Sequence, residues 1–175
     1  MQTSEVIDKS DIKEPALLIL KNKFIRNGDF SAIFNADKAG IISFAFKYMN
    51  RDNYYLFEIG GFKEAQKFYR LRKKINGMMK QIMKINKIDE LPKSAFNKKA
   101  KIFGYEKDTF YLVRIMILEK NIKVFYSKLG KKENLIFDVN DSDIPYGNIG
   151  LGTFLTTAVF DNITLRPSIA PKSNI

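Results

Sequence analysis

The sequence predicts an all-β fold, an antiparallel sandwich or barrel, on three observations. Short runs of β-branched, aromatic and aliphatic residues follow one another at near-regular spacing, separated by polar or glycine-containing turns. Several of these runs alternate apolar and polar residues with period two. The composition, with 45% hydrophobic residues, 15 Phe and 8 Tyr in 175 residues, supplies the large apolar side chains that packed sheets need.

The expected strands follow from these runs in chain order. The first are 16–20, 30–34, 40–49, 54–59, 67–75 and 78–85. After a stretch without strand character come 110–119, 121–126, 135–139, 148–154 and 158–165. Alternation assigns side chains to faces, so we expect Phe44, Phe46 and Tyr48 on one face of the third run. In the last run, Phe160 is expected to point inward and Asp161 outward or to an edge.

Turn signals separate the runs. Asn27-Gly28 and Asn76-Gly77 carry the dipeptide of tight hairpins, in which both central residues tolerate positive φ. Residues 119–121 are expected to form a short polar reversal. The Asn-Arg-Asp-Asn stretch at 50–53 stands between two aromatic-rich runs, and we expect it to be the turn between neighbouring strands of one sheet. Asn and Asp are favoured there because their side chains bond to nearby backbone groups.

The chain is expected to contain one domain, over residues 15–167. The polar segments 1–14 and 168–175 are expected to be flexible. The stretch 84–101 is rich in lysine and lacks a strand period, so we expect a short irregular or helical insertion on the sandwich surface.

Composition excludes several classes of function. The chain has no cysteine and no histidine, which excludes disulfides, cysteine zinc sites, cysteine nucleophiles and Ser-His-Asp catalysis. No apolar run is long enough for a transmembrane helix, and the N-terminus lacks the hydrophobic core of a signal peptide.

The net charge of +11 has two interpretations. The abundance of Lys, Ile and Asn fits the compositional drift of AT-rich coding. Alternatively, basic clusters at 70–74 and 97–101 indicate a patch for an anionic partner, such as a sulfated glycan. Nucleic acid is not expected, because the aromatic residues match core periodicity and no RNA-binding signature is present.

Several pieces of sequence, taken as an ordered set, resemble a known family. They are 44–48, 51–57, 67–77, 104–105, 111–115, 121–125, 136–143, 147–151 and 159–163. The set resembles the concanavalin A-like lectin/glucanase jelly roll, in its laminin-G-like and thrombospondin C-terminal-like versions. The resemblance implies an antiparallel two-sheet β-sandwich. Glycines 147, 150 and 152 then fit a strand that is approached closely by its neighbours.

The resemblance implies a non-catalytic recognition or cell-adhesion module of a cell-surface or secreted protein, binding a glycan or an acidic partner surface. The alternative is a protein–protein interaction or scaffolding domain without a sugar site, which the lack of tryptophan favours. A degenerate glycoside hydrolase is the weaker alternative.

The acidic residues argue against an enzyme. Relatives that cleave glycosidic bonds carry E-x-D-x-E on one strand, which places alternate carboxylates on one face. In this chain Glu58 stands alone, whereas Asp138, Asp141 and Asp143 sit at a strand end and are expected to cap a turn. We therefore predict no enzymatic activity.

A sugar site is expected at one rim or on the concave face. The candidate ligand-binding residues are Arg51, Asp52, Tyr54, Tyr55, Arg70 and Arg72. Aromatic faces suit sugar CH groups, and arginine suits sulfate or carboxylate. Alternation puts Tyr54 and Tyr55 on opposite faces, so one site can contain only one of them.

Calcium is the one cofactor that the resemblance implies. Many related sandwiches hold a structural calcium ion at the rim, often through an acid in the last strand. Asp161 is the leading candidate ligand, and Asp29 lies in a turn that could approach it.

Overall fold

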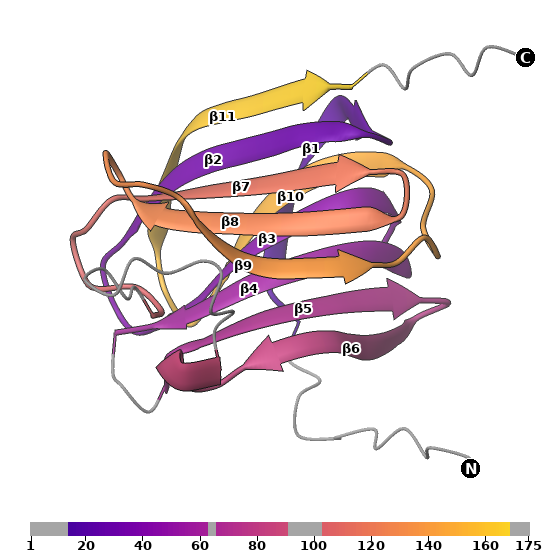
Figure 1. Cartoon of the computed structure of the whole chain (residues 1–175). Helices are drawn as coiled ribbons and strands as arrows, with labels where there is room; N and C mark the ends of the chain where they lie inside the picture. Colours follow the sequence, from indigo (N-terminus) through magenta and orange to yellow (C-terminus); the bar gives the residue numbers. More distant parts are fainter. Residues whose placement is uncertain (1–13, 63–65, 91–102, 169–175) are drawn as a thin grey trace, which may run out of the picture.

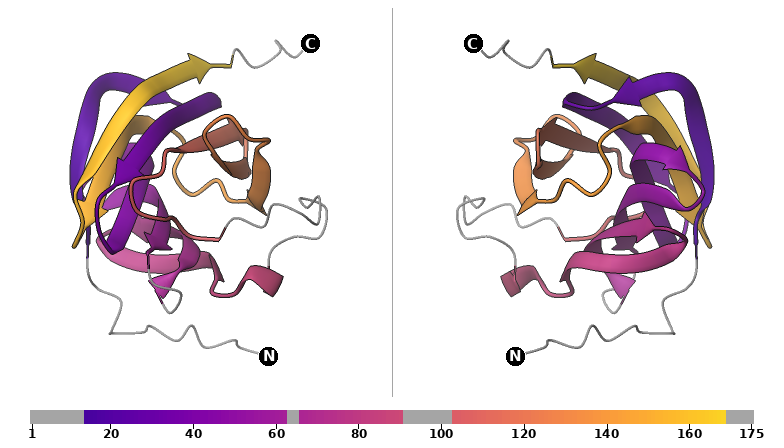
Figure 2. Two further views of the ribbon diagram at one scale, coloured as in Figure 1. Left: turned by 90° about the vertical axis from the view of Figure 1, so that its left-hand side faces the viewer. Right: turned by 90° about the vertical axis from the view of Figure 1, so that its right-hand side faces the viewer.

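The computed structural model describes residues 14–62, 66–90 and 103–168, whose strands form two sheets packed face to face (Figure 1 and Figure 2). The strands are β1 (Ala16–Ile25), β2 (Gly28–Ala36), β3 (Gly40–Asn50), β4 (Asn53–Gly61), β5 (Phe68–Ile75), β6 (Met78–Ile85), β7 (Tyr111–Leu118), β8 (Asn121–Lys128), β9 (Asn134–Asn140), β10 (Gly147–Phe154) and β11 (Ala158–Pro167). The predicted all-β sandwich is confirmed, and each predicted run corresponds to a strand.

The two sheets differ in size, and each contains strands from both ends of the chain. The six-stranded sheet has the order β1-β10-β3-β4-β5-β6, and the five-stranded sheet has the order β11-β2-β7-β8-β9. Each neighbouring pair is antiparallel. Pairing of β1 with β10 and of β2 with β11 joins the first strands to the last, so neither half of the chain can complete a sheet alone.

Aromatic rings fill the space between the sheets. Phe34 is central, with its ring centroid 6.3 Å from that of Tyr126 and 5.9 Å from that of Phe44. Phe160 points inward and meets Phe44 edge to face at 6.0 Å, whereas Asp161 is exposed, as alternation predicted. Such aromatic pairs each add about 1 kcal/mol to the stability that burial of their area supplies.

The face predicted for Tyr48 is wrong. Lys47 has a φ of 47°, and the register of β3 against β4 shifts after Phe46. This bulge reverses the alternation: Phe46 stays in the core, whereas Tyr48 lies on the outer face and stacks on Tyr54 with centroids 5.3 Å apart. A bulge adds one unpaired residue, which period-two alternation does not detect.

The two Asn-Gly dipeptides behave differently. Asn76 and Gly77 have φ values of 50° and 82° and form the predicted hairpin between β5 and β6. Asn27 and Gly28 connect β1 to β2, which belong to different sheets, so the hairpin predicted there is wrong. The dipeptide favours a sharp local turn, but partners elsewhere in the chain decide which sheet each strand joins.

The other two predicted reversals are confirmed. Residues 50–53 join β3 to β4, and the side chain of Asn50 accepts a hydrogen bond from the backbone N–H of Asp52 at 2.9 Å. Glu119, with a φ of 54°, lies in the short turn between β7 and β8. Both turns therefore use the local chemistry that the sequence shows.

The predicted insertion is seen only in part. Strand β6 continues to Ile85, and a short 3₁₀ helix, η3 (Ile88–Glu90), follows it. Residues 91–102 of the predicted insertion, and residues 1–13 and 169–175 of the predicted terminal segments, lie outside the described residues.

Candidate ligand-binding faces

The outer face of the six-stranded sheet carries a polar row among apolar side chains. Antiparallel register places Ser43, Glu58, Arg70 and Lys84 side by side on β3, β4, β5 and β6. Arg72 lies on the same face, because alternate residues of a strand share a face. The sequence thus gathers one acid and two arginines from two neighbouring strands.

Glu58 sits between the two arginines. Arg70 Nε donates to one carboxylate oxygen and Arg72 Nη2 donates to the other, each at 2.8 Å. The side chains of the three residues are only 1–5% exposed. Withdrawing such charges from water costs several kcal/mol per ion, which good geometry must offset. We call this set the Glu58 group.

Aromatic rings border the Glu58 group. The guanidinium of Arg70 lies over the Phe68 ring, 5.1 Å from its centroid, and Lys74 Nζ lies 5.9 Å from the centroid of Tyr54. Lys74 Nζ also pairs with Glu14 Oε1 at 2.7 Å. Burial, followed by the negative charge of Glu14, raises the pKa of Tyr54. The residues just before β1 therefore reach across this face to β5.

The structure separates the predicted ligand-binding residues. Tyr54 shares the outer face with both arginines, whereas Tyr55 lies in the core, as alternation predicted. Arg51 and Asp52 lie in the turn between β3 and β4, where Arg51 Nε is 3.8 Å from Asp52 Oδ1 and the Arg51 side chain is 89% exposed. That turn stands at the end of the sheet and not on the face with the Glu58 group.

Tyr55 belongs instead to a network at the rim. Its hydroxyl donates to Asp141, and Lys73 Nζ lies 2.5 Å from Asp141 Oδ2 and 2.7 Å from Asp143 Oδ2. Burial raises the pKa of Asp141, but hydrogen bonds from Lys73 and Tyr55 outweigh this and bring the pKa below its ordinary value. Asp141 also accepts from the backbone N–H of Asp143 at 3.2 Å, the turn-capping role that the sequence predicted.

The two acids predicted for calcium do not come together. Asp161 pairs with Ile33, about 13 Å along β2 from Asp29 at the usual rise of a strand. Asp29 accepts from Arg114 Nη1 at 3.1 Å, and Asp161 accepts from the backbone N–H of Asn162 at 2.7 Å. Among the described residues no three acids, cysteines or histidines gather where they could hold a metal ion. Asp29 and Asp161 therefore do not fit a shared calcium site.

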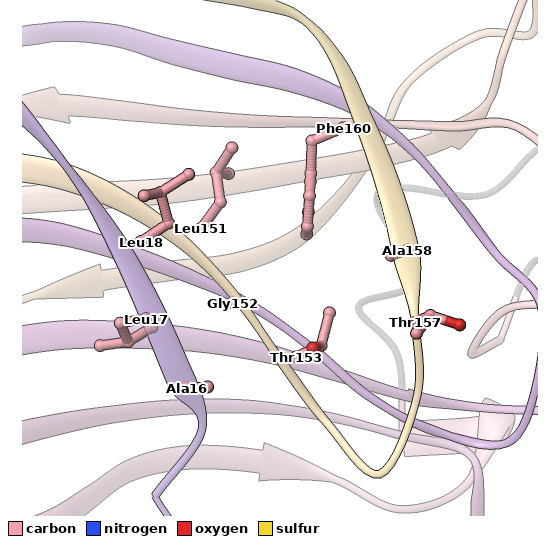
Figure 3. Close-up of a pocket in the computed structure, with 9 residues that line it drawn as sticks. All are labelled: Ala16, Leu17, Leu18, Leu151, Gly152, Thr153, Thr157, Ala158 and Phe160. Atoms are coloured by element: carbon pink, nitrogen blue, oxygen red, sulfur yellow. The ribbon is translucent and has the colours of Figure 1, made fainter.

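An apolar hollow opens between the edge strands β1 and β11 (Figure 3). Its volume is about 460 Å³, and the side chains of Leu18, Leu151 and Phe160 lie around it. Leu18 and Val159 are 67% and 66% exposed. Apolar side chains this exposed at two adjacent sheet edges form a surface suited to contact with another molecule.

Comparisons with known proteins support the fold. No family model matches the sequence, and no curated protein matches it. The carbohydrate-binding module CBM66 from Bacillus subtilis is 16% identical with a TM-score of 0.65, over 87% of this chain and 83% of that chain. A tetrameric galectin from the ball sponge Cinachyrella sp. is 12% identical with a TM-score of 0.55, over 87% and 99%. Congerin II in its lactose- and MES-liganded form is 13% identical with a TM-score of 0.58, over 87% and 100%.

The chain therefore has the concanavalin A-like jelly-roll fold, and the resemblance seen in the sequence is confirmed at the level of fold. At these identities the comparisons establish the architecture alone. In the described part of the chain, none of the helical structure is long and apolar enough to span a membrane.

Sequence reasoning selects the two arginines but not Glu58, which joins them. The E-x-D-x-E pattern considers acids of one strand only, and Glu58 has no acidic neighbour there. A usable signal exists: an acid within an apolar strand needs a cationic partner, and Arg70 and Arg72 supply it at period two on the next strand.

Proposed function

We propose that the chain is a non-catalytic module of a secreted or cell-surface protein that binds a glycan through the outer face of its six-stranded sheet. The observation that carries the proposal is the Glu58 group, in which one carboxylate is held by two guanidinium groups on a sheet face. The fold shared with a carbohydrate-binding module and with galectins supports it, and one such neighbour is lactose-liganded.

The chemistry of the Glu58 group suits polyhydroxyl ligands. A carboxylate has about four lone-pair sites and a guanidinium has five N–H donors, so the group combines hydrogen-bond acceptors with donors. Sugar hydroxyls both donate and accept, and the Phe68 ring beside Arg70 offers an apolar face for sugar CH groups. The guanidinium groups of Arg70 and Arg72 also suit a glycan that carries carboxylate or sulfate, which arginine binds by paired hydrogen bonds.

A ligand must first open this face, because the Glu58 group is almost closed to solvent. The contact between Glu14 and Lys74 lies beside Tyr54 on the same face. Glu14 is 47% exposed, and ion pairs of exposed groups contribute only about 0–1 kcal/mol. We propose that Glu14 leaves Lys74 when the ligand binds.

A glycan array tests the proposal. The purified protein is applied with calcium and with chelator, at low and at moderate salt. We expect binding to defined acidic glycans that Arg72→Lys weakens, because lysine keeps the charge but not the planar donor geometry. The matched control, Lys128→Arg, exchanges the same two cations on the opposite sheet and should bind as wild type. Equal binding by both variants, with unchanged melting temperatures, would reject the Glu58 group as the site.

The absence of catalysis is part of the same proposal. In the described residues, two pairs of carboxylates each share one cation. Asp141 and Asp143 pair with Lys73, and Asp29 and Glu133 pair with Arg114. A two-carboxylate glycosidase needs one acid free to give its proton to the leaving oxygen. Acids bound to cations do not suit that role.

Protein binding is the second candidate, favoured by the exposed apolar edge of β1 and β11. Absence of binding to every glycan on the array, under each condition, would favour this candidate. Substitution of Leu18 or Val159 by glutamate would then test the edge directly.

A further inference from the structure

A polar pocket lies on the outer face of the five-stranded sheet, on the opposite side of the sandwich from the Glu58 group. Its volume is about 330 Å³, near the lower end of the range for ligand pockets. The residues that line it are Asp29, Ser31, Leu112, Arg114, Glu133, Thr164 and Arg166. They come from β2, β7 and β11 and from the residue just before β9.

Arg114 organises the pocket. Its Nε and Nη2 atoms lie 2.8 Å and 2.7 Å from Glu133 Oε2, and its Nη1 donates to Asp29 Oδ1 at 3.1 Å. The guanidinium carbon lies 4.2 Å from the centroid of the Phe125 ring. These contacts hold the side chain in one position, while Arg114, Asp29 and Glu133 remain 29–37% exposed. The pocket is thus both preorganised and open to solvent.

The charges of the pocket balance. The lining contains two carboxylates and two guanidinium groups, and hydroxyls of Ser31 and Thr164 complete its polar part. Arg166 is exposed and forms no ion pair with any residue of the described ranges. Its donors are therefore available to a ligand, whereas those of Arg114 are mostly used internally.

We propose that this pocket binds one neutral sugar unit. A net-neutral lining offers no preference for an ion, but it supplies both acceptors and donors, which a polyhydroxyl ligand can satisfy at once. Leu112 provides an apolar surface for the CH groups of the ring. The site needs no contribution from the Glu58 group, so one chain could bridge two saccharides from opposite faces, with the gain in avidity that two linked sites provide.

The test is a titration of the ¹⁵N-labelled protein, observed by NMR, with D-glucose, D-galactose, D-fructose and lactose in turn. We expect saturable shifts at the amides of Ser31, Leu112 and Thr164 in the millimolar range. Arg166→Ala should weaken this binding roughly tenfold, because it removes the available donors. The matched control, Lys128→Ala, removes a cation from the same sheet outside the pocket and should leave the affinity unchanged.

The outcomes separate this site from the Glu58 group. Shifts confined to Ser43, Leu56 and Gln81 would support the first face and overturn the second site. No saturable shift at Ser31, Leu112 or Thr164 with any of the four sugars would also overturn it, as would equal effects of the two alanine variants. Retention of those shifts in Arg72→Lys would support two independent sites.

Discussion

Glu58 and Arg70 lie opposite each other on β4 and β5, and their side chains form an ion pair at 2.8 Å that is almost closed to solvent. Arg72 completes the arrangement from two residues further along β5. The carboxylate places a negative charge between two neighbouring guanidinium ions that are almost closed to solvent, so the three side chains depend on one another.

Replacement of Glu58 by glutamine should lower the free energy of unfolding by about 3–5 kcal/mol, because two buried guanidinium groups lose the charged carboxylate to which both donate. Urea denaturation measures this change. The control is Asp138→Asn, which neutralises an acid paired with Lys123 at 3.4 Å on a more exposed surface and should cost less than about 1 kcal/mol. Equal losses in the two variants would show that the Glu58 group is not a coupled unit.

Replacement of Lys47 by methionine should stabilise the protein. Burial, together with the charge of Arg26, lowers the pKa of Lys47, although Asp141 acts in the opposite direction. A base whose pKa is lowered in the folded state binds fewer protons when folded. The free-energy cost of burying the charged Lys47 is therefore fully present below that folded-state pKa. Stability then rises with pH between the folded value and the ordinary value of about 10.4. Lys47→Met should unfold at higher urea near neutral pH, and its advantage over wild type should shrink toward alkaline pH.

The bulge at Lys47 is one of the features that could not be predicted from the sequence. Apolar alternation and turn dipeptides are local properties, and they sufficed for the strands and for the hairpins at 50–53 and 76–77. The bulge at Lys47 and the crossing at Asn27-Gly28 depend on pairing with distant strands, namely β10 and β11. Arg70 and Arg72 could be predicted as candidate site residues because they lie in one basic run, which is a local property of the sequence. The role of Glu58 depends instead on the register of β4 against β5.

Asp141 should make the protein sensitive to acid. Its folded-state pKa lies below the ordinary value, so its contribution is fully present above the unfolded-state pKa and is lost as pH falls through the folded-state pKa. Asp141→Asn should remove this contribution at neutral pH, at a cost of about 1–3 kcal/mol, because Lys73 and Tyr55 lose a charged partner. Urea midpoints measured from neutral to acidic pH should therefore converge for the two proteins. A constant difference at all pH values would contradict the role given to Asp141.

Gly147 should tolerate no side chain. A Cβ atom there would lie 2.3 Å from the backbone carbon of Lys47, because β10 passes close to the bulge of β3. Gly147→Ala should therefore cost about 3 kcal/mol, at the upper end for overpacking. Gly130→Ala is the control: its φ of 75° strains an alanine, but a Cβ there meets no atom within 4 Å, so we expect about 1 kcal/mol. Thermal unfolding of both variants distinguishes a clash from backbone strain.

Glu14 should restrain ligand binding at the Glu58 group. Its carboxylate pairs with Lys74 at 2.7 Å over the face that we propose binds the glycan, and 47% of the Glu14 side chain is exposed. Loss of a contact worth about 0–1 kcal/mol should strengthen binding up to roughly fivefold in Glu14→Ala, without a comparable change in melting temperature. Calorimetric titration with an acidic glycan selected on the array measures the affinity, and Glu106→Ala, which removes an exposed acid paired with Lys67, is the control. Weaker binding by Glu14→Ala than by Glu106→Ala would mean that Glu14 contacts the ligand directly and does not cover its site.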